Sequence, residues 1–342
     1  MTSRGAAAPA ARRLCAVNRG LRALPSTAVQ PSCGRAGSGA APAAGEAQLQ
    51  ADALLAEHRY LFELMGFVVL PGVLSAAELA VLNVKVDVNI GGRGGADWVG
   101  NARFGENPAA FDDMMAGQKE NLSGGYLDWG SEFVDLLDHP KLLPYLGFTL
   151  DAGRTNRGRY YGSAVNGGTN GIRLDRLYGI EQHAGPLREG GFHQDWEGQY
   201  SFERGVMRNS LVVAAYNLKD SGGEDGGFCC LPGSHKAHLE MPQTFQKALN
   251  GPGNGLPAGA VVPLAPAGSV ILFSEALVHA TSAWTSGRHH RRVLLYKYAV
   301  KHVAQGRDAV PPATVPLSSQ QQLLFAAPQE GLEATFRPVV RE

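Results

Sequence analysis

The sequence predicts a mainly β domain with flanking helices, and three observations support this prediction. From about residue 151 to residue 302, short apolar runs alternate with turns rich in Gly, Asn and Asp, a pattern typical of a sandwich or closed barrel. Glycine is abundant, with 44 among 342 residues, which suits a loop-rich β fold better than a helical bundle. Helical spacing of apolar residues is concentrated before residue 150.

The N-terminal part of the domain, residues 46–150, is predicted to hold most of the helices. Apolar residues recur at helical spacing up to Met65, and Ser75 with Glu78 forms a capping box that opens a second helix reaching about Val86. The other elements expected here are a strand at 67–70, a loop with short helices at 91–130, and a helix at 131–146 interrupted near 139–140.

The core, about 151–302, is predicted from apolar runs of strand length. The expected strands are 173–178, 191–195, 210–218, 228–231, 261–264, 269–273 and 293–300. The tail, 303–342, holds one short helical stretch at 318–325. No internal repeat or interdomain linker stands out, so residues 46–342 are expected to form a single domain.

The first 45 residues differ in composition from the rest. They contain six arginines and no acidic residue, and Ala, Ser, Pro and Gly make up much of the remainder. This composition is typical of a transit peptide to a chloroplast or mitochondrion, although an ordinary disordered tail would look similar. Organellar localisation is therefore expected, with the cytoplasm as the alternative.

Charge and cysteine content exclude several classes of protein. Without the leader, 25 basic residues face 31 acidic ones, which argues against a nucleic-acid partner bound through its phosphates. No apolar run is long enough to predict a membrane span. The four cysteines form neither a disulfide framework nor a zinc-binding pattern, and the adjacent Cys229 and Cys230 should point to opposite faces of a strand. The oligomeric state is not predicted.

A His-X-Asp triplet, His193-Gln194-Asp195, is the first candidate site. On a strand, His193 and Asp195 would point to one face. His279, just after a buried-strand pattern, could bring a second imidazole to them. Two imidazoles and one carboxylate are the ligands of non-haem Fe(II) sites that activate O2. A chance triplet on a solvated loop and a core histidine are the alternatives.

Several motifs in one order resemble the phytanoyl-CoA dioxygenase-like family of Fe(II)/2-oxoglutarate oxygenases. The resemblance covers about residues 66–300. The matching pieces are Phe192-His-Gln-Asp-Trp196, Gly226-Gly-Phe228, Leu231-Pro-Gly-Ser-His235, Gly268–Phe273 with His279, and Arg291-Arg-Val-Leu-Leu295. It implies a double-stranded β-helix, a cupin-like jelly roll, which agrees with the strand pattern.

The resemblance implies that His193, Asp195 and His279 bind Fe(II), with 2-oxoglutarate and O2 as co-substrates. It also implies an arginine that binds the distal carboxylate of 2-oxoglutarate, since guanidinium offers two parallel donors. The register favours Arg291 over Arg292. The chain departs from the family pattern here, because the spacing from His279 is one residue longer and Trp284 stands where Asn is common.

Other residues are weaker candidates. Thr281 and Gln194 could contact 2-oxoglutarate, although a local hydrogen bond would explain either equally well. Trp196, Tyr178 and Gln182 are candidates for the substrate pocket, with core packing as the alternative.

The predicted function is hydroxylation of a small molecule, lipid-like or another metabolite, with release of succinate and CO2. A non-catalytic protein that binds or senses a metal and a 2-oxo acid on the same scaffold is the alternative. A cupin-like metal enzyme without a 2-oxo acid is less favoured, because two arginines begin the last core strand. The substrate itself cannot be derived from the fold.

Overall fold

The structure is a computed structural model that describes residues 44–90, 101–107, 124–150, 171–185, 191–194, 200–203, 206–246, 255–301 and 309–326. The chain divides into two compact units, Met1–Gln48 and Leu49–Glu342. The predicted leader lies outside the described residues except for its last two positions, so its targeting role stays a prediction. The features below belong to the second unit, apart from the first residues of the helix Ala44–Met65, which lie in the first.

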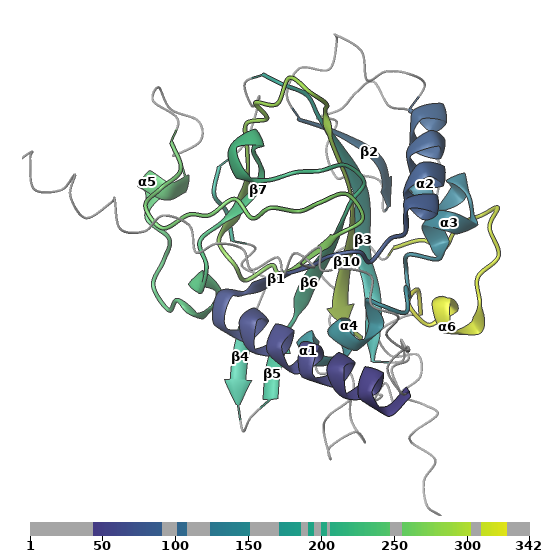
Figure 1. Cartoon of the computed structure of the whole chain (residues 1–342), viewed down its shortest axis with the longest axis horizontal. Helices are drawn as coiled ribbons and strands as arrows, with labels where there is room; N and C mark the ends of the chain where they lie inside the picture. Colours follow the sequence, from purple (N-terminus) through teal and green to yellow (C-terminus); the bar gives the residue numbers. More distant parts are fainter. Residues whose placement is uncertain are drawn as a thin grey trace, which may run out of the picture. The chain divides into compact units, whose positions relative to one another are not determined.

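A six-stranded antiparallel sheet forms the centre of this unit (Figure 1). Its strands, in spatial order, are β1 (Phe67–Leu70), β8 (Val270–Ser274), β6 (Leu211–Asn217), β10 (Arg291–Val300), β3 (Ile172–Gln182) and β2 (Asn101–Asn107). Neighbouring strands are distant in sequence, since β10 pairs with both β3 and β6. Such non-local antiparallel order is expected of a jelly roll.

A smaller sheet pairs β7 (Gly227–Cys230) with β9 (His279–Ser282). Isolated bridges extend it on both sides, from His279 to His193 and from Cys230 to Val261. An inner cluster of buried side chains includes residues of both sheets, such as Phe228 from β7 and Phe273 from β8. The protein therefore has the two-sheet organisation that the sequence predicts.

The other elements flank these sheets. They are α1 (Ala44–Met65), α2 (Ala76–Asn89), η1 (Gly125–Trp129), α3 (Ser131–Val134), α4 (Leu143–Thr149), η2 (Gly223–Asp225), η3 (Ser234–Lys236), α5 (Gln243–Gln246), α6 (Ser319–Gln322) and the hairpin of β4 (Tyr200–Glu203) and β5 (Val206–Asn209). None of the described helices is long and apolar enough to cross a membrane.

The capping box predicted at Ser75 is present. The Ser75 hydroxyl accepts a hydrogen bond from the Glu78 backbone N–H at 3.3 Å, and the Glu78 carboxylate accepts one from the Ser75 N–H at 2.7 Å. These bonds satisfy two backbone donors that a helix leaves unpaired at its start. Helix α2 runs three residues further than expected, to Asn89.

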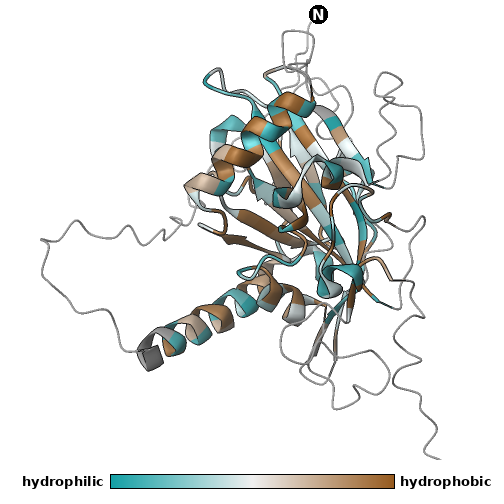
Figure 2. Ribbon diagram, turned by 90° about the vertical axis from the view of Figure 1, so that its right-hand side faces the viewer, coloured by the Kyte–Doolittle hydropathy of each residue, from teal (hydrophilic) through white to brown (hydrophobic). Residues whose placement is uncertain are grey.

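The helices and the outer face of the large sheet share a second core, rich in buried tyrosines. Three of their hydroxyls donate to backbone carbonyls: Tyr126 to Leu295 at 3.0 Å, Tyr296 to Phe133 at 2.7 Å and Tyr216 to Leu136 at 2.9 Å. These bonds satisfy hydroxyls that would otherwise be buried without partners. Brown, hydrophobic segments lie along the strands and alternate with teal, hydrophilic ones on the helices (Figure 2).

Two predicted elements are wrong, and a third is confirmed. The loop expected at 91–130 contains β2, an edge strand whose polar sequence gives no strand signal. The strand expected at 261–264 is reduced to the Val261 bridge, because Pro263 has no N–H for a ladder. The helix expected at 131–146 is divided into α3 and α4, which confirms the interruption predicted near 139–140, because proline cannot continue a helix.

Two further expectations were incomplete. Within 191–195, His193 forms a bridge rather than a regular strand, and Asp195 lies outside the described residues. The strands β4, β5 and β9 were missed as separate elements. Cys229 and Cys230 do point to opposite faces, because Cys230 packs in the inner cluster and Cys229 packs with Phe192 and Val278.

Candidate active site

Strand β10 places its first two arginines on opposite faces of the large sheet, as the alternation of side chains along a strand requires. Arg291 shares its face with Val293 and Leu295, which belong to the inner cluster. Arg292 shares the other face with Leu294 and Tyr296, which belong to the outer core. The two residues therefore have different surroundings despite their adjacency.

Arg291 is buried, with 3% of its surface exposed. Among the described residues, no carboxylate pairs with it, and its Nε has no hydrogen-bond partner. Its Nη1 donates a long bond of 3.4 Å to Oε1 of Gln182. Burial lowers the pKa of Arg291 to about 10, so the group is still a cation at neutral pH. An anion bound beside it would neutralise a buried cation in this state.

Arg292 is also buried, but it is fully paired. It donates to both oxygens of Glu181, from Nε at 2.7 Å and from Nη2 at 3.1 Å. Its Nη2 and Nη1 also donate to Asp87 and Asn83 of α2, at 2.7 Å and 3.1 Å. Arg292 thus connects the sheet to α2 and has no donor set to offer a ligand.

His193 and His279 lie side by side in the smaller sheet. Each backbone N–H donates to the carbonyl of the other, at 3.0 Å and 2.9 Å, and the ring centroids are 4.3 Å apart. The backbone therefore sets the separation of the two imidazoles.

Hydrogen bonds also determine which ring nitrogen of each histidine can bind a metal. Nδ1 of His279 lies 2.7 Å from the carbonyl of Leu277, and Nδ1 of His193 lies 3.2 Å from that of Gly191. A carbonyl oxygen only accepts, so in the neutral rings Nδ1 carries the proton and Nε2 the lone pair. The same arrangement orients the histidine ligands of protein metal sites.

A charged pair lies close to His279 inside the barrel. The carboxylate of Glu275, which is fully buried, is 3.8 Å from Nε2 of His279. Nζ of Lys297, from β10, is 2.6 Å from the same carboxylate. Neither residue was predicted from the sequence. Strand alternation could have identified them, because it puts Glu275 on the same face as Phe273 and Lys297 on the same face as Leu295.

The remaining predicted residues divide into three groups. Gln182 is buried beside Arg291, and Thr281 follows His279 on the same face of β9. Tyr178 packs against the inner cluster with the Arg103 guanidinium 4.5 Å above its ring, while Gln194 donates to the carbonyl of Ala276 at 2.6 Å. Asp195 and Trp196 lie outside the described residues.

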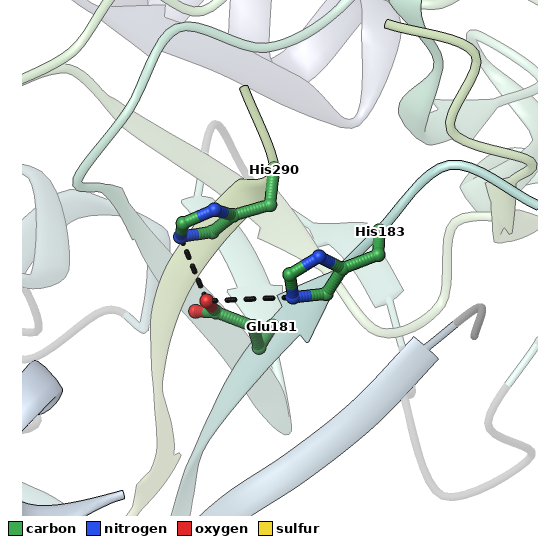
Figure 3. Close-up of side chains that lie close together, drawn as sticks. All are labelled: Glu181, His183 and His290. Atoms are coloured by element: carbon green, nitrogen blue, oxygen red, sulfur yellow. Dashed lines mark ion pairs between the residues drawn. The ribbon is translucent and has the colours of Figure 1, made fainter. Parts of the chain in front are cut away.

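A second group of metal-ligand residues was not predicted: Glu181, His183 and His290 (Figure 3). Their ligand atoms all lie within 4.8 Å of one another, and the imidazole rings stack with centroids 4.9 Å apart. Two histidines and one carboxylate make this group a candidate facial triad by composition. In the sequence, this group could have been identified from a Glu-X-His pair followed by a distant histidine.

The charges around this second group are unfavourable for a divalent cation. The Glu181 carboxylate already accepts from Arg292, and Nζ of Lys219 lies 2.6 Å from Nε2 of His290. Burial acts to raise the pKa of Glu181, but the bonds from His290 and Arg292 outweigh it and lower this pKa to about 2. Glu181 is thus an anion whose charge is neutralised by its neighbours.

The comparisons with known proteins agree with this architecture. Residues 62–293 match the family described as phytanoyl-CoA dioxygenase (PhyH). The fold and site are those of an Fe(II)/2-oxoglutarate-dependent oxygenase of the double-stranded β-helix type. The chain belongs to the phytanoyl-CoA dioxygenase family, which confirms the resemblance in the sequence. No curated protein sequence matches the chain significantly.

Solved structures of HygX from Streptomyces hygroscopicus share the fold. The form with nickel and 2-oxoglutarate bound is 19% identical, with a TM-score of 0.53 over 79% of this chain and 98% of that one. The form that also holds hygromycin B is 19% identical, with a TM-score of 0.51 over 79% and 99%. The iron-bound form is 19% identical, with a TM-score of 0.51 over 77% and 94%. At this identity the likeness shows the fold.

Proposed function

We propose that the protein is an Fe(II)- and 2-oxoglutarate-dependent dioxygenase that hydroxylates a small molecule, with the metal bound by His193, Asp195 and His279. The observation that carries the proposal is the buried Arg291, which is a cation without an acidic partner among the described residues. A dicarboxylate co-substrate would supply the missing anion. The HygX structures that hold 2-oxoglutarate, iron and hygromycin B support the choice of co-substrate, metal and substrate class.

The two histidines fit a divalent metal ion. Their Nδ1 atoms are held by backbone carbonyls, so each ring presents Nε2 as its ligand atom. The carboxylate of Asp195, two residues after His193 in the sequence, would complete a site of two imidazoles and one carboxylate. Bound iron and 2-oxoglutarate would supply O2 activation and the oxidation of a C–H bond, with release of succinate and CO2.

The protein's own residues provide binding and orientation. Arg291 would bind the distal carboxylate through a planar pair of N–H donors, and Thr281 lies on the face of β9 that also carries His279. Buried aromatic rings next to His279, those of Phe273 and Phe228, exclude water from this side of the site. A dry site strengthens the interaction between the guanidinium and a carboxylate.

The deciding experiment measures Fe(II) binding and succinate formation in alanine variants of both histidine groups. We expect His279→Ala and Asp195→Ala to lose both, whereas His183→Ala and His290→Ala retain them, since Arg292 and Lys219 disfavour a cation at the second group. The last two variants are matched controls, because they also remove one imidazole each. Wild-type succinate formation by Asp195→Ala, or its loss in His183→Ala with normal folding, would contradict the assignment.

The alternative is a protein that binds the metal and the 2-oxo acid without turnover. It is distinguished by succinate formation in the absence of substrate, with Fe(II), O2 and 2-oxoglutarate present. A dioxygenase should consume 2-oxoglutarate slowly under these conditions, whereas a sensor should bind it without consuming it.

A further inference from the structure

We propose that Gln182 is a positioning residue that aims the Arg291 guanidinium at its anion while leaving the charge of that guanidinium available. This inference rests on the proposed function, in which Arg291 binds 2-oxoglutarate. Gln182 lies directly opposite Arg291 in the pairing of β3 with β10. It is completely buried, and its side chain belongs to the interior rather than to an opening.

The orientation of the Gln182 amide follows from its second hydrogen bond. Nε2 of Gln182 donates to the carbonyl oxygen of Ser282 on β9 at 2.8 Å. A carbonyl can only accept, so this end of the amide must be the NH2 group. Oε1 is then the atom that faces Nη1 of Arg291, at 3.4 Å. The smaller sheet thus fixes the amide, and the amide restrains the guanidinium.

The space for the Arg291 side chain is made by Gly227. A Cβ atom at Gly227 would lie 3.0 Å from both Cδ and Nε of Arg291. Oγ of Ser282 donates to the carbonyl of Gly227 at 3.1 Å. Arg291 is therefore held between Gln182 on one strand and the Gly227 backbone on another, and Ser282 joins these two supports.

The adjacent cross-strand pair shows why a neutral partner matters. Arg292 lies opposite Glu181, and this acid neutralises it. Arg291 lies opposite an amide, which accepts a hydrogen bond but carries no charge. A glutamate at position 182 would have nearly the same shape, but it would lose the donor to the Ser282 carbonyl. It would also form an ion pair with Arg291 and compete with an incoming carboxylate.

The test compares Gln182→Glu and Gln182→Leu in the full-length protein. The dissociation constant of 2-oxoglutarate is measured by calorimetry with Fe(II) under anaerobic conditions. We expect it to rise at least tenfold in Gln182→Glu, and about threefold to tenfold in Gln182→Leu, which loses one hydrogen bond to a charged group. At saturating 2-oxoglutarate, succinate formation by Gln182→Leu should return to within about twofold of wild type, because a positioning residue affects KM more than kcat.

Unfolding of the ligand-free protein provides a readout that does not depend on the co-substrate. Both variants lose the hydrogen bond to the Ser282 carbonyl, but only Gln182→Glu gives the buried Arg291 a carboxylate partner, so its urea midpoint should be above that of Gln182→Leu. A residue with only a packing role would lower the midpoint in both variants and leave 2-oxoglutarate binding unchanged. Gln243→Glu, the same change at an exposed glutamine of α5, is the matched control and should behave as wild type.

Three results would overturn the inference. One is a dissociation constant within twofold of wild type in both variants, and another is a Gln182→Glu protein that folds and binds 2-oxoglutarate normally. Because the glutamate variant is nearly isosteric, it decides the matter even if Gln182→Leu does not fold. The third, a wild-type protein that does not bind 2-oxoglutarate at all, is distinguishable because it would overturn the proposed function as well.

Discussion

Arg291 and Arg292 are neighbours on β10, yet one faces an amide inside the barrel and the other faces a carboxylate in the outer core. With the proposed function, this relationship assigns a binding role to Arg291 and a stabilising role to Arg292, at consecutive positions. It also leads to opposite expectations for the same substitution at the two sites.

The first prediction concerns methionine at each position, which keeps much of the side-chain volume. Arg292→Met leaves the buried Glu181 without its main partner, so the free energy of unfolding should fall by about 3 kcal/mol or more. Arg291→Met leaves no carboxylate among the described residues without its partner. The free energy of unfolding should therefore be unchanged or higher, while 2-oxoglutarate binding is lost. Urea unfolding and calorimetry check both. Equal destabilisation by the two variants would contradict the assignment.

The second prediction is a pH dependence of stability that originates at His235. Burial lowers the pKa of this histidine to about 4, from 6.5, where its Nε2 lies 3.0 Å from the carbonyl of Glu63. The unfolded chain binds the proton more readily, so the contribution is complete above pH 6.5 and decreases as pH falls towards 4, by about 3 kcal/mol in total. Between pH 7 and pH 5, the free energy of unfolding measured in urea should fall by about 2 kcal/mol less in His235→Gln than in wild type. If the free energy of unfolding changed equally with pH in both proteins, His235 would be excluded as the source of the pH dependence.

The third prediction compares alanine at two glycines with positive φ. Gly227 has φ of 100° and Gly72 has φ of 62°, so both substitutions carry a backbone cost of roughly 1–2 kcal/mol. A Cβ at Gly72 meets no atom within 4 Å, whereas at Gly227 it meets the side chain of Arg291. We expect only Gly227→Ala to weaken 2-oxoglutarate binding as well. If Gly72→Ala weakened it equally, the effect would be a general one on folding.

The fourth prediction concerns the start of α2. Ser75→Ala removes one half of the capping box and should lower the free energy of unfolding by about 1 kcal/mol. Ser75→Thr keeps the hydroxyl and should remain close to wild type. Because Asn83 and Asp87 of α2 contact Arg292 and not Arg291, the KM for 2-oxoglutarate should be the same in all three proteins. A raised KM in Ser75→Ala would show that α2 also supports the site.

Sequence patterns predicted the elements that bury an apolar face or carry a local capping signal. Strand β1 was predicted with its observed bounds, and Ser75 identified the start of α2. The edge strand β2 was missed because, of the side chains described in it, few are buried and it lacks alternation. The strand expected at 261–264 failed because its apolar pattern ignores Pro263, and in the structure Leu264 of this segment is exposed, with 61% of its surface accessible.

The faces of neighbouring strand residues were predictable from the sequence, whereas contacts that depend on strand pairing were not. Side chains alternate along a strand, so adjacent Arg291 and Arg292 must point to opposite faces of β10, and the structure places them so. The pairing of Gln182 with Arg291 depends on the register between β3 and β10, which no local pattern specifies. For the same reason, the Glu275–Lys297 pair and the group of Glu181, His183 and His290 were found only in the structure.

The reciprocal backbone bonds between His193 and His279 have a consequence for metal affinity. Both bonds come from the main chain, so the two rings are neighbours without an ion. In the proposed site, the binding of iron would therefore not need to provide the free energy to assemble them. Preorganisation of this kind increases affinity without adding a contact. It also means that replacing either imidazole leaves the main-chain link intact, so such variants report on coordination chemistry and not on the architecture of the barrel.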